Sequence, residues 1–207
     1  MKFDPSLYLV VGQEFTNGRN LAELVAEAVA GGVTMVQLRE KRANLREFTE
    51  LARALKSALA PSGVPLIIND SVEIAQCIGA QGVHIGQSDM PYAQARRILG
   101  PAAYIGLSVE TIDQAQEAEA LDVDYLGISP VFASASKQDT GTPWGLEGLS
   151  QLREHSKHCL VAIGGITTEN AGRVIRAGAH GIAVVSAICS ATEPRLAAAA
   201  LRDAIRA

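Results

Sequence analysis

The most informative pattern in this chain is Ile78-Gly-Ala-Gln-Gly-Val-His-Ile-Gly86, and a similar pattern recurs as Ala177-Gly-Ala-His-Gly-Ile-Ala-Val184. Each segment reads as the end of a helix, a glycine cap and then a short apolar strand. Gly31 occupies the same place before a third apolar run. A repeated helix-to-strand unit of this kind indicates strands and helices that alternate along the chain.

Eight short runs rich in Val, Ile, Leu and Tyr surround these units, and their continuous apolar character is typical of parallel strands covered by helices. The predicted strands are residues 7–11, 34–38, 65–68, 83–85, 103–106, 124–128, 160–163 and 182–185. The intervening segments 21–30, 45–59 and 111–120 have the apolar spacing of helices. Eight such units fit a closed (β/α)8 barrel, or TIM barrel, better than an open sheet. We therefore expect an α/β fold in which residues 1–207 form a single compact domain.

The composition limits the possible partners. The 207 residues carry a formal net charge of −4, so we expect no nucleic-acid or membrane partner, and any anionic small molecule must be bound locally. The three cysteines lack the spacing of a zinc site or a disulfide framework, which favours buried thiols in a reducing compartment. The N-terminus lacks the pattern of a signal peptide, and we expect a cytoplasmic protein, which could form a homo-oligomer.

Polar residues alternate along the second predicted strand. Gln37, Arg39 and Lys41 are spaced two residues apart, so strand geometry places all three side chains on one face. Two cations then point toward the C-terminal mouth of the barrel, where they need acidic partners or an anionic ligand. Pairing with Glu40 or Asp70 is the alternative to ligand binding.

Two acidic residues follow neighbouring strands, because Asp70 comes after the third predicted strand and Asp89 after the fourth. Consecutive strands of a barrel are neighbours, so we expect the two carboxylates to approach each other at the C-terminal rim, beside the cations. A magnesium ion that also binds phosphate oxygens would relieve their repulsion. Alternatively, each carboxylate caps the helix that follows it.

The ends of the last two strands have the character of a phosphate site. The seventh strand is followed by Gly164-Gly165 and the eighth by Ser186. Glycine lets the backbone approach a phosphate, while backbone amides and the serine hydroxyl supply hydrogen-bond donors. The segment 129–145 is long for a loop of such a barrel and contains Lys137, which favours a functional lid over a tolerated surface insertion.

The four histidines lack the arrangement of a metal site. His155 and His158 lie in a polar run, and we expect both on a solvated helix face. For His84 and His180 we expect core packing or a hydrogen bond to the backbone.

Taken in order along nearly the whole chain, these motifs resemble the thiamine phosphate synthase family. They are Gln37-Leu-Arg-Glu-Lys41, Asn69-Asp70, Gly82-Val-His-Ile-Gly-Gln-Ser-Asp89, Ser108, Ser129-Pro-Val-Phe132 with Lys137, Gly164-Gly-Ile166 and Val185-Ser-Ala-Ile188. Each motif is modest alone, but their place at the ends of successive predicted strands makes the set specific. The chain departs from the family at the end of the first strand, where Val11-Gly12 stands in place of Thr-Asp.

The resemblance implies a magnesium-dependent transferase. It would join a hydroxymethylpyrimidine diphosphate to a thiazole phosphate, giving thiamine phosphate and diphosphate, by loss of diphosphate and attack of the thiazole nitrogen. By the same resemblance the catalytic residues are Arg39, Lys41, Ser108 and Lys137, and the Mg²⁺ ligands are Asp70 and Asp89. The residues implied to bind the substrates are Gln37, Leu38, Arg39, Glu40, Lys41, Asn69, Ser108, Ser134, Ala135, Ser136, Lys137, Gly165, Val185 and Ser186. Ser134 and Ser136 stand where the family usually has threonines, and both keep the hydroxyl donor.

Two alternative functions stay open. A thiazole tautomerase-type isomerase would share the barrel and the phosphate loops but would not need the magnesium and diphosphate residues, so Asp70, Asp89 and Lys137 argue against it. A non-catalytic phosphate-binding barrel would act as a carrier or regulator. An assay for thiamine phosphate formation separates the three functions.

Overall fold

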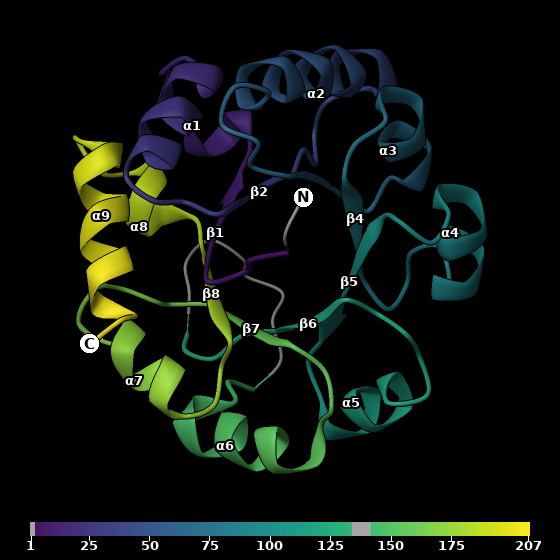
Figure 1. The fold of residues 1–207 in the computed structure, drawn as a ribbon, viewed down its shortest axis with the longest axis vertical. Helices are drawn as coiled ribbons and strands as arrows, with labels where there is room; N and C mark the ends of the chain where they lie inside the picture. The colour runs from purple at the N-terminus through teal and green to yellow at the C-terminus, as the bar shows by residue number, and fades with distance from the viewer. Residues whose placement is uncertain (1–2, 134–141) are drawn as a thin grey trace.

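The computed structural model describes residues 3–133 and 142–207, and it confirms the predicted single-domain (β/α)8 barrel. Eight parallel strands pair in sequence order, and the last pairs with the first, so that the barrel is closed (Figure 1). The strands are β1 Leu7–Val11, β2 Met35–Leu38, β3 Leu66–Asn69, β4 Gly82–Ile85, β5 Tyr104–Val109, β6 Tyr125–Ile128, β7 Leu160–Ile163 and β8 Gly181–Val184. They agree with the predicted strands to within one or two residues, except that β5 continues for three residues further.

Helices form an outer ring around the strands (Figure 1). They are the 3₁₀ helix η1 Gln13–Phe15 and the α-helices α1 Leu21–Ala30, α2 Leu45–Leu59, α3 Val72–Ile78, α4 Tyr92–Leu99, α5 Ile112–Ala118, α6 Gly145–His155, α7 Ala171–Arg176, α8 Ser186–Cys189 and α9 Pro194–Ala204. The predicted helices 21–30 and 45–59 coincide with α1 and α2. The third predicted helix, 111–120, is shorter in the structure: α5 begins at Ile112, because Thr111 caps its N-terminus with its side chain, and it ends at Ala118.

Two hydrophobic cores hold the barrel together. The larger core lies between the strands and the helices, and it includes Val36 and Leu38 of β2. The smaller core lies inside the barrel, where Tyr8, Met35 and Tyr125 are no more than 1% exposed. Successive side chains of a strand point to opposite faces, so most of the strands contribute to both cores. This double burial explains why the strands are apolar without alternation.

The repeated helix-to-strand segment has a packing reason. Gly79 ends α3 in the left-handed conformation with φ 62°, as the glycine-cap pattern predicts. Gly82 begins β4 and Gly181 begins β8. A Cβ added to Gly82 would lie 2.1 Å from the Tyr104 carbonyl oxygen, and one added to Gly181 would lie 1.9 Å from the Pro5 carbonyl oxygen, so both would collide with the neighbouring backbone. Glycine therefore lets adjacent strands begin in close contact.

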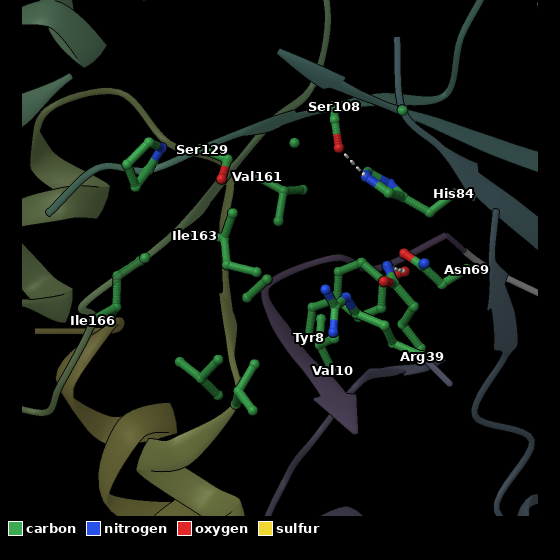
Figure 2. Close-up of a pocket in the computed structure, with 18 of the residues that line it drawn as sticks. Tyr8, Val10, Arg39, Asn69, His84, Ser108, Ser129, Val161, Ile163 and Ile166 are labelled. Carbon is green, nitrogen blue, oxygen red and sulfur yellow. Dashed lines mark hydrogen bonds between the residues drawn. The ribbon is translucent and has the colours of Figure 1, made fainter. Parts of the chain in front are cut away.

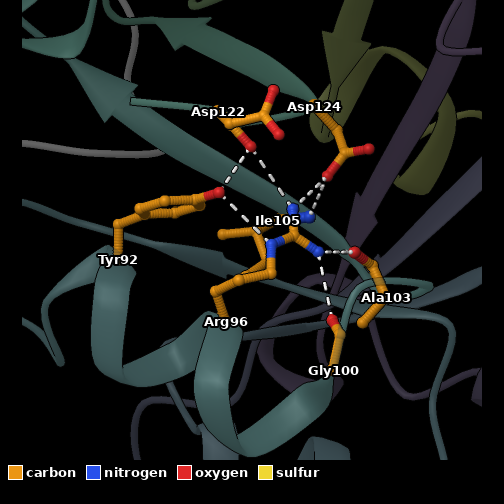
Figure 3. Close-up of polar contacts among 7 residues, drawn as sticks. All are labelled: Tyr92, Arg96, Gly100, Ala103, Ile105, Asp122 and Asp124. Carbon is orange, nitrogen blue, oxygen red and sulfur yellow. Dashed lines mark hydrogen bonds and ion pairs between the residues drawn. The ribbon is translucent and has the colours of Figure 1, made fainter. Parts of the chain in front are cut away.

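A polar cluster around Arg96 fastens α4 to the beginnings of β5 and β6 (Figure 3). The guanidinium group donates to the carbonyl oxygens of Gly100 and Ala103, at 3.2 and 2.5 Å, and pairs with the Asp124 carboxylate at 3.0 Å. The same carboxylate oxygen accepts the Ile105 amide at 2.8 Å. These contacts lie at the N-terminal ends of the strands, where the residues of such a barrel serve stability and not chemistry.

Two side-chain expectations from the sequence are wrong. Cys77 is exposed rather than buried, although all three cysteines are free thiols. His158 is only 6% exposed, because it lies beyond the last residue of α6 and its Nε2 atom is 3.0 Å from the Ala118 carbonyl oxygen. His155 is exposed on α6, as expected. Within the described residues, no helix combines the length and the apolar character needed to cross a membrane.

Candidate active site

A cavity of about 560 Å³ opens at the C-terminal ends of the strands. Figure 2 shows Arg39 and Asn69 on one side of it and the apolar Val161 and Ile163 on another. The predicted site residues that line this cavity are Gln37, Arg39, Lys41, Asn69, Asp70, Asp89, Ser108, Gly165, Val185 and Ser186. The fold thus brings together residues from six of the eight strand ends, which is where barrel enzymes place their active sites.

The two carboxylates meet at the rim, as the strand order predicts. Asp70 and Asp89 are close enough to share a hydrogen bond. Burial raises the pKa of Asp89 above its ordinary value, the amide of Gly86 opposes the rise by donating at 2.7 Å, and the charge of Asp70 adds to it. Such a pair attracts either a proton or a cation.

Neither carboxylate serves as a helix cap, so the alternative reading of both is wrong. Ser71 caps α3 by accepting the Ile74 amide at 3.2 Å, and Asp70 before it has φ 63°. Pro91 stands at the N-terminus of α4, which has no side-chain cap. A left-handed backbone is uncommon for a residue other than glycine, and it turns the Asp70 side chain toward the cavity it lines.

Each of the two cations that follow β2 is paired with an acidic side chain at the rim. Lys41 Nζ lies 2.5 Å from an Asp70 carboxylate oxygen, so the alternative of internal pairing holds for this lysine. Arg39 pairs instead with Glu14 of η1 at 3.4 Å, and Glu14 was not foreseen. Glu40 points away from the cations, because its carboxylate accepts the Gln13 amide at 2.6 Å. Both ion pairs are partly exposed, with side chains 22–47% accessible, so an incoming anion can compete with the carboxylates for them.

A chain of hydrogen bonds crosses the floor of the cavity, and sequence reasoning missed most of it. Gln37 Nε2 lies 2.8 Å from the Tyr8 hydroxyl, which lies 2.9 Å from the Tyr125 hydroxyl. Tyr125 in turn lies 3.0 Å from His84 Nδ1, and His84 Nε2 lies 2.8 Å from Ser108 Oγ. The expected packing of His84 is confirmed, because the ring is buried and stacks on Tyr125, but its hydrogen bonds to two side chains were not foreseen. The expectation for His180 is confirmed, because its Nδ1 accepts the Leu160 amide at 3.0 Å.

Two glycines make room for this chain. A Cβ added to Gly106 would lie 2.1 Å from Cζ of Tyr125, and one added to Gly127 would lie 2.9 Å from Cε1 of His84. Gly106 in β5 stands opposite Tyr125 of the neighbouring β6, whereas Gly127 in β6 is separated from His84 in β4 by β5, and an added side chain at either position would enter the barrel. A glycine in a strand interior marks a close approach, and this was the one available sequence signal for the buried rings.

The glycine pair after β7 forms a tight turn beside the cavity. Gly164 and Gly165 have φ values of 107° and 62°, and a Cβ on Gly165 would lie 2.6 Å from the Ala133 carbonyl oxygen. Asn170 fixes the turn by donating to the Gly165 carbonyl oxygen at 2.9 Å. Ser186 begins α8 directly after β8, on the same side of the cavity. This half of the cavity offers backbone amides and a hydroxyl, which suit a phosphate group.

The remaining predicted site residues lie elsewhere. The side chain of Leu38 is fully buried in the core between strands and helices, so only its backbone is available to a ligand in the cavity. Four predicted residues, Ser134, Ala135, Ser136 and Lys137, fall outside the described part of the chain. Phe15 of η1 lines the cavity and was not predicted.

Comparisons with known proteins agree with this geometry. A family profile described as thiamine monophosphate synthase matches residues 7–188. The thiamine-phosphate synthase of Albidiferax ferrireducens is 57% identical over 97% of this chain and 92% of its own length, and that of Azorhizobium caulinodans is 50% identical over 98% and 96%. Among solved structures, the thiamine phosphate pyrophosphorylase of Pyrococcus furiosus superposes with a TM-score of 0.87 at 36% identity, covering 98% of this chain and 96% of that one. The chain belongs to the thiamine monophosphate synthase family.

Proposed function

We propose that this cavity joins a hydroxymethylpyrimidine diphosphate to a thiazole phosphate, producing thiamine phosphate and diphosphate. The observation that carries the proposal is that the cavity has two different polar sides. Cations and paired carboxylates stand at the ends of β2, β3 and β4, while the glycine turn and Ser186 stand at the ends of β7 and β8. Two anionic groups can therefore bind on opposite sides of a partly apolar space.

The diphosphate side is supported by charge. Arg39 and Lys41 line the cavity with partly exposed side chains, and each is held by a single carboxylate that an anion can replace. As the bond between the pyrimidinylmethyl carbon and the diphosphate breaks, its electron pair leaves with the diphosphate oxygen. The two cations stabilise that growing negative charge, and Asn69 adds an amide at the same rim. The resemblance adds Lys137 to this group.

The residues present fit a magnesium ion. Mg²⁺ is usually held in proteins by one or two carboxylates together with substrate phosphate oxygens and water. Asp70 and Asp89 supply that number of carboxylates beside the proposed diphosphate site. The described residues contain no cluster of three or more His, Cys, Asp or Glu side chains able to hold a metal alone, so the remaining ligands would come from the substrate. When bound, the ion would neutralise charge on the departing diphosphate.

The carbon left by the diphosphate carries positive charge, which the electron-rich aminopyrimidine ring can delocalise. The thiazole nitrogen then forms the new bond with its own lone pair, so that no proton has to be removed by the protein. Val161, Ile163 and Phe15 give this part of the cavity apolar walls that limit the access of water. Gly165, Val185 and Ser186, with Ser134, Ala135 and Ser136, would hold the thiazole phosphate in place for the attack.

The test is direct. Purified protein is mixed with both substrates and Mg²⁺, and thiamine phosphate and diphosphate are measured; equal amounts of the two products are expected. Omitting either substrate is the control, and Asp89→Asn is expected to lose the Mg²⁺-dependent turnover while it keeps the fold. A protein that binds both compounds but forms neither product contradicts the proposal, and conversion of the thiazole phosphate alone to an isomer would favour the tautomerase alternative.

A further inference from the structure

We propose that Gln37, Tyr8, Tyr125 and His84 form a hydrogen-bond chain with one fixed direction, which makes the Ser108 hydroxyl a hydrogen-bond donor into the cavity. Tyr8, Tyr125 and His84 are then positioning residues that act through Ser108. The direction of the chain does not depend on the proposed function, but the value of a donor at Ser108 for the reaction does rest on it.

The direction follows from the first member. The structure places the amide nitrogen of Gln37, which can only donate, 2.8 Å from the Tyr8 hydroxyl. Tyr8 accepts this bond with its oxygen; because a buried hydroxyl hydrogen is rarely left unpaired, we assign the Tyr8 hydrogen to the Tyr125 oxygen, 2.9 Å away. Tyr125 accepts that hydrogen bond and directs its hydrogen to Nδ1 of His84 at 3.0 Å. Nδ1 is therefore an acceptor, and the hydrogen of the neutral imidazole lies on Nε2.

The hydrogen bond between His84 and Ser108 decides whether the Ser108 hydroxyl can donate to a ligand. Because His84 Nε2 carries the hydrogen, it donates to Ser108 Oγ at 2.8 Å. The serine oxygen is used as an acceptor on that side, and its own hydrogen is left for another partner. Ser108 lines the cavity, and within residues 3–133 and 142–207 no acceptor for its hydroxyl hydrogen is recorded. A substrate oxygen or ring nitrogen in the cavity can accept it.

Burial keeps both tyrosines from ionising, so ionisation does not change the direction of the hydrogen bonds. Tyr8 is 1% exposed and Tyr125 is fully buried, and burial raises the pKa of each phenol well above its ordinary value. Each tyrosine therefore keeps its single hydrogen and can donate in one direction only. The Tyr8 and Tyr125 rings pack edge to face with centroids 5.8 Å apart, and the His84 and Tyr125 rings stack at 5.4 Å. Close packing around Gly106 and Gly127 holds these rings in place.

The direction is tested by the tautomer of His84, read from ring ¹⁵N chemical shifts of protein labelled in its four histidines. His84→Gln identifies the resonances. At pH 8 and without ligand, the wild type is expected to show a protonated Nε2 and an unprotonated Nδ1. Gln37→Glu replaces a donor by an ionised acceptor, so every bond of the chain should reverse and the hydrogen should move to Nδ1. In a protein that also carries Tyr8→Phe, Gln37→Glu should leave the tautomer unchanged, because the relay is cut.

These spectra can overturn the proposal without any assay of activity. A wild type with the hydrogen on Nδ1 refutes the direction. A tautomer that ignores Gln37→Glu in the protein with an intact Tyr8 refutes the coupling along the chain.

A double-mutant cycle tests whether the chain acts on the reaction through Ser108. Tyr125→Phe removes one hydroxyl and keeps the ring, and it should lower kcat about fivefold, the usual weight of one hydrogen bond, with little change in the KM for the thiazole phosphate. In a Ser108→Ala background the same substitution should leave kcat unchanged. Tyr92→Phe is the control, because it deletes a hydroxyl bonded at 2.7 Å to the Asp122 carbonyl oxygen far from the cavity. Equal effects of Tyr125→Phe in both backgrounds contradict the proposal, whereas absence of condensation in every variant and the wild type contradicts the proposed function instead.

Discussion

Substitution of Gly106 by alanine should disable the site from a position that does not line the cavity. Gly106 stands in β5 opposite Tyr125 of β6. A Cβ built on it would lie 2.1 Å from Cζ and 2.4 Å from the hydroxyl oxygen of Tyr125, well inside contact distance. The ring cannot rotate away easily, because Tyr8, His84 and Phe3 pack against it.

The cost can be worked from this collision. One extra methyl group forced into a well-packed core destabilises a protein by about 1–3 kcal/mol. For a chain of this length, each kcal/mol lowers the melting temperature by about 2–4 °C. We therefore expect Gly106→Ala to lower Tm by roughly 2–12 °C. The displaced Tyr125 hydroxyl should also lose Tyr8 or His84, so kcat should fall in protein that is still folded.

Gly148→Ala supplies the matched control. Gly148 lies in α6, where an added Cβ would meet only Trp144 side-chain atoms at 3.4 and 3.6 Å. Alanine replaces glycine in a helix with a gain of about 0.5–1 kcal/mol, so Tm should rise slightly and kcat should stay unchanged. Thermal unfolding followed by circular dichroism and steady-state kinetics at 25 °C measure both quantities. A Gly106→Ala protein with wild-type Tm and kcat would refute the claim that Tyr125 is held by close packing.

Three further predictions follow from other parts of the structure. Because burial raises the pKa of Asp89, a proton would compete there with the proposed Mg²⁺, and calorimetric Mg²⁺ affinity in the presence of diphosphate should rise with pH through a range above the ordinary carboxyl values; an affinity that does not change with pH would contradict this competition. Asn44→Ala breaks the capping box with Glu47 at the start of α2 and should cost about 1 kcal/mol in urea unfolding while kcat is unchanged; an unaltered urea midpoint would contradict the cap. Arg96→Met leaves the Asp124 carboxylate without its cation and should lower stability by about 2 kcal/mol, again without effect on kcat at 25 °C; a loss of activity in folded protein would place Arg96 in the site instead.

The sequence predicted correctly those features that have a local signal, and those that follow from the order of the strands, because strands that are consecutive in the chain are neighbours in the barrel. The apolar runs predicted all eight strands, and the segments 21–30 and 45–59 predicted α1 and α2 to the residue. Because strand ends meet at one rim, the order of the chain was enough to place Asp70 beside Asp89 and Arg39 in the cavity. These expectations needed no knowledge of the tertiary contacts.

Capping and pairing were harder to predict. Asp70 and Asp89 each stand near a helix start and could have been caps, but Ser71 takes that role in α3 and α4 has no side-chain cap. The partner of Arg39 is Glu14, which belongs to a different strand-to-helix connection. Such choices depend on the path of the backbone around each loop, which hydrophobic periodicity does not encode.

The sequence by itself determined the barrel, its order of strands and the place of Arg39, Lys41, Asp70 and Asp89 at its mouth, because these follow from burial and from strand periodicity. Only the tertiary structure decided that Tyr8 and Tyr125, on strands that are not neighbours, meet across the barrel interior and connect Gln37 to Ser108. It also decided that Asp89 is buried enough for its pKa to rise. The physical reason is that a hydrogen bond across the interior, like the burial of a charge, depends on the stagger of all the strands at once, whereas a sequence motif reports only on residues close in the chain.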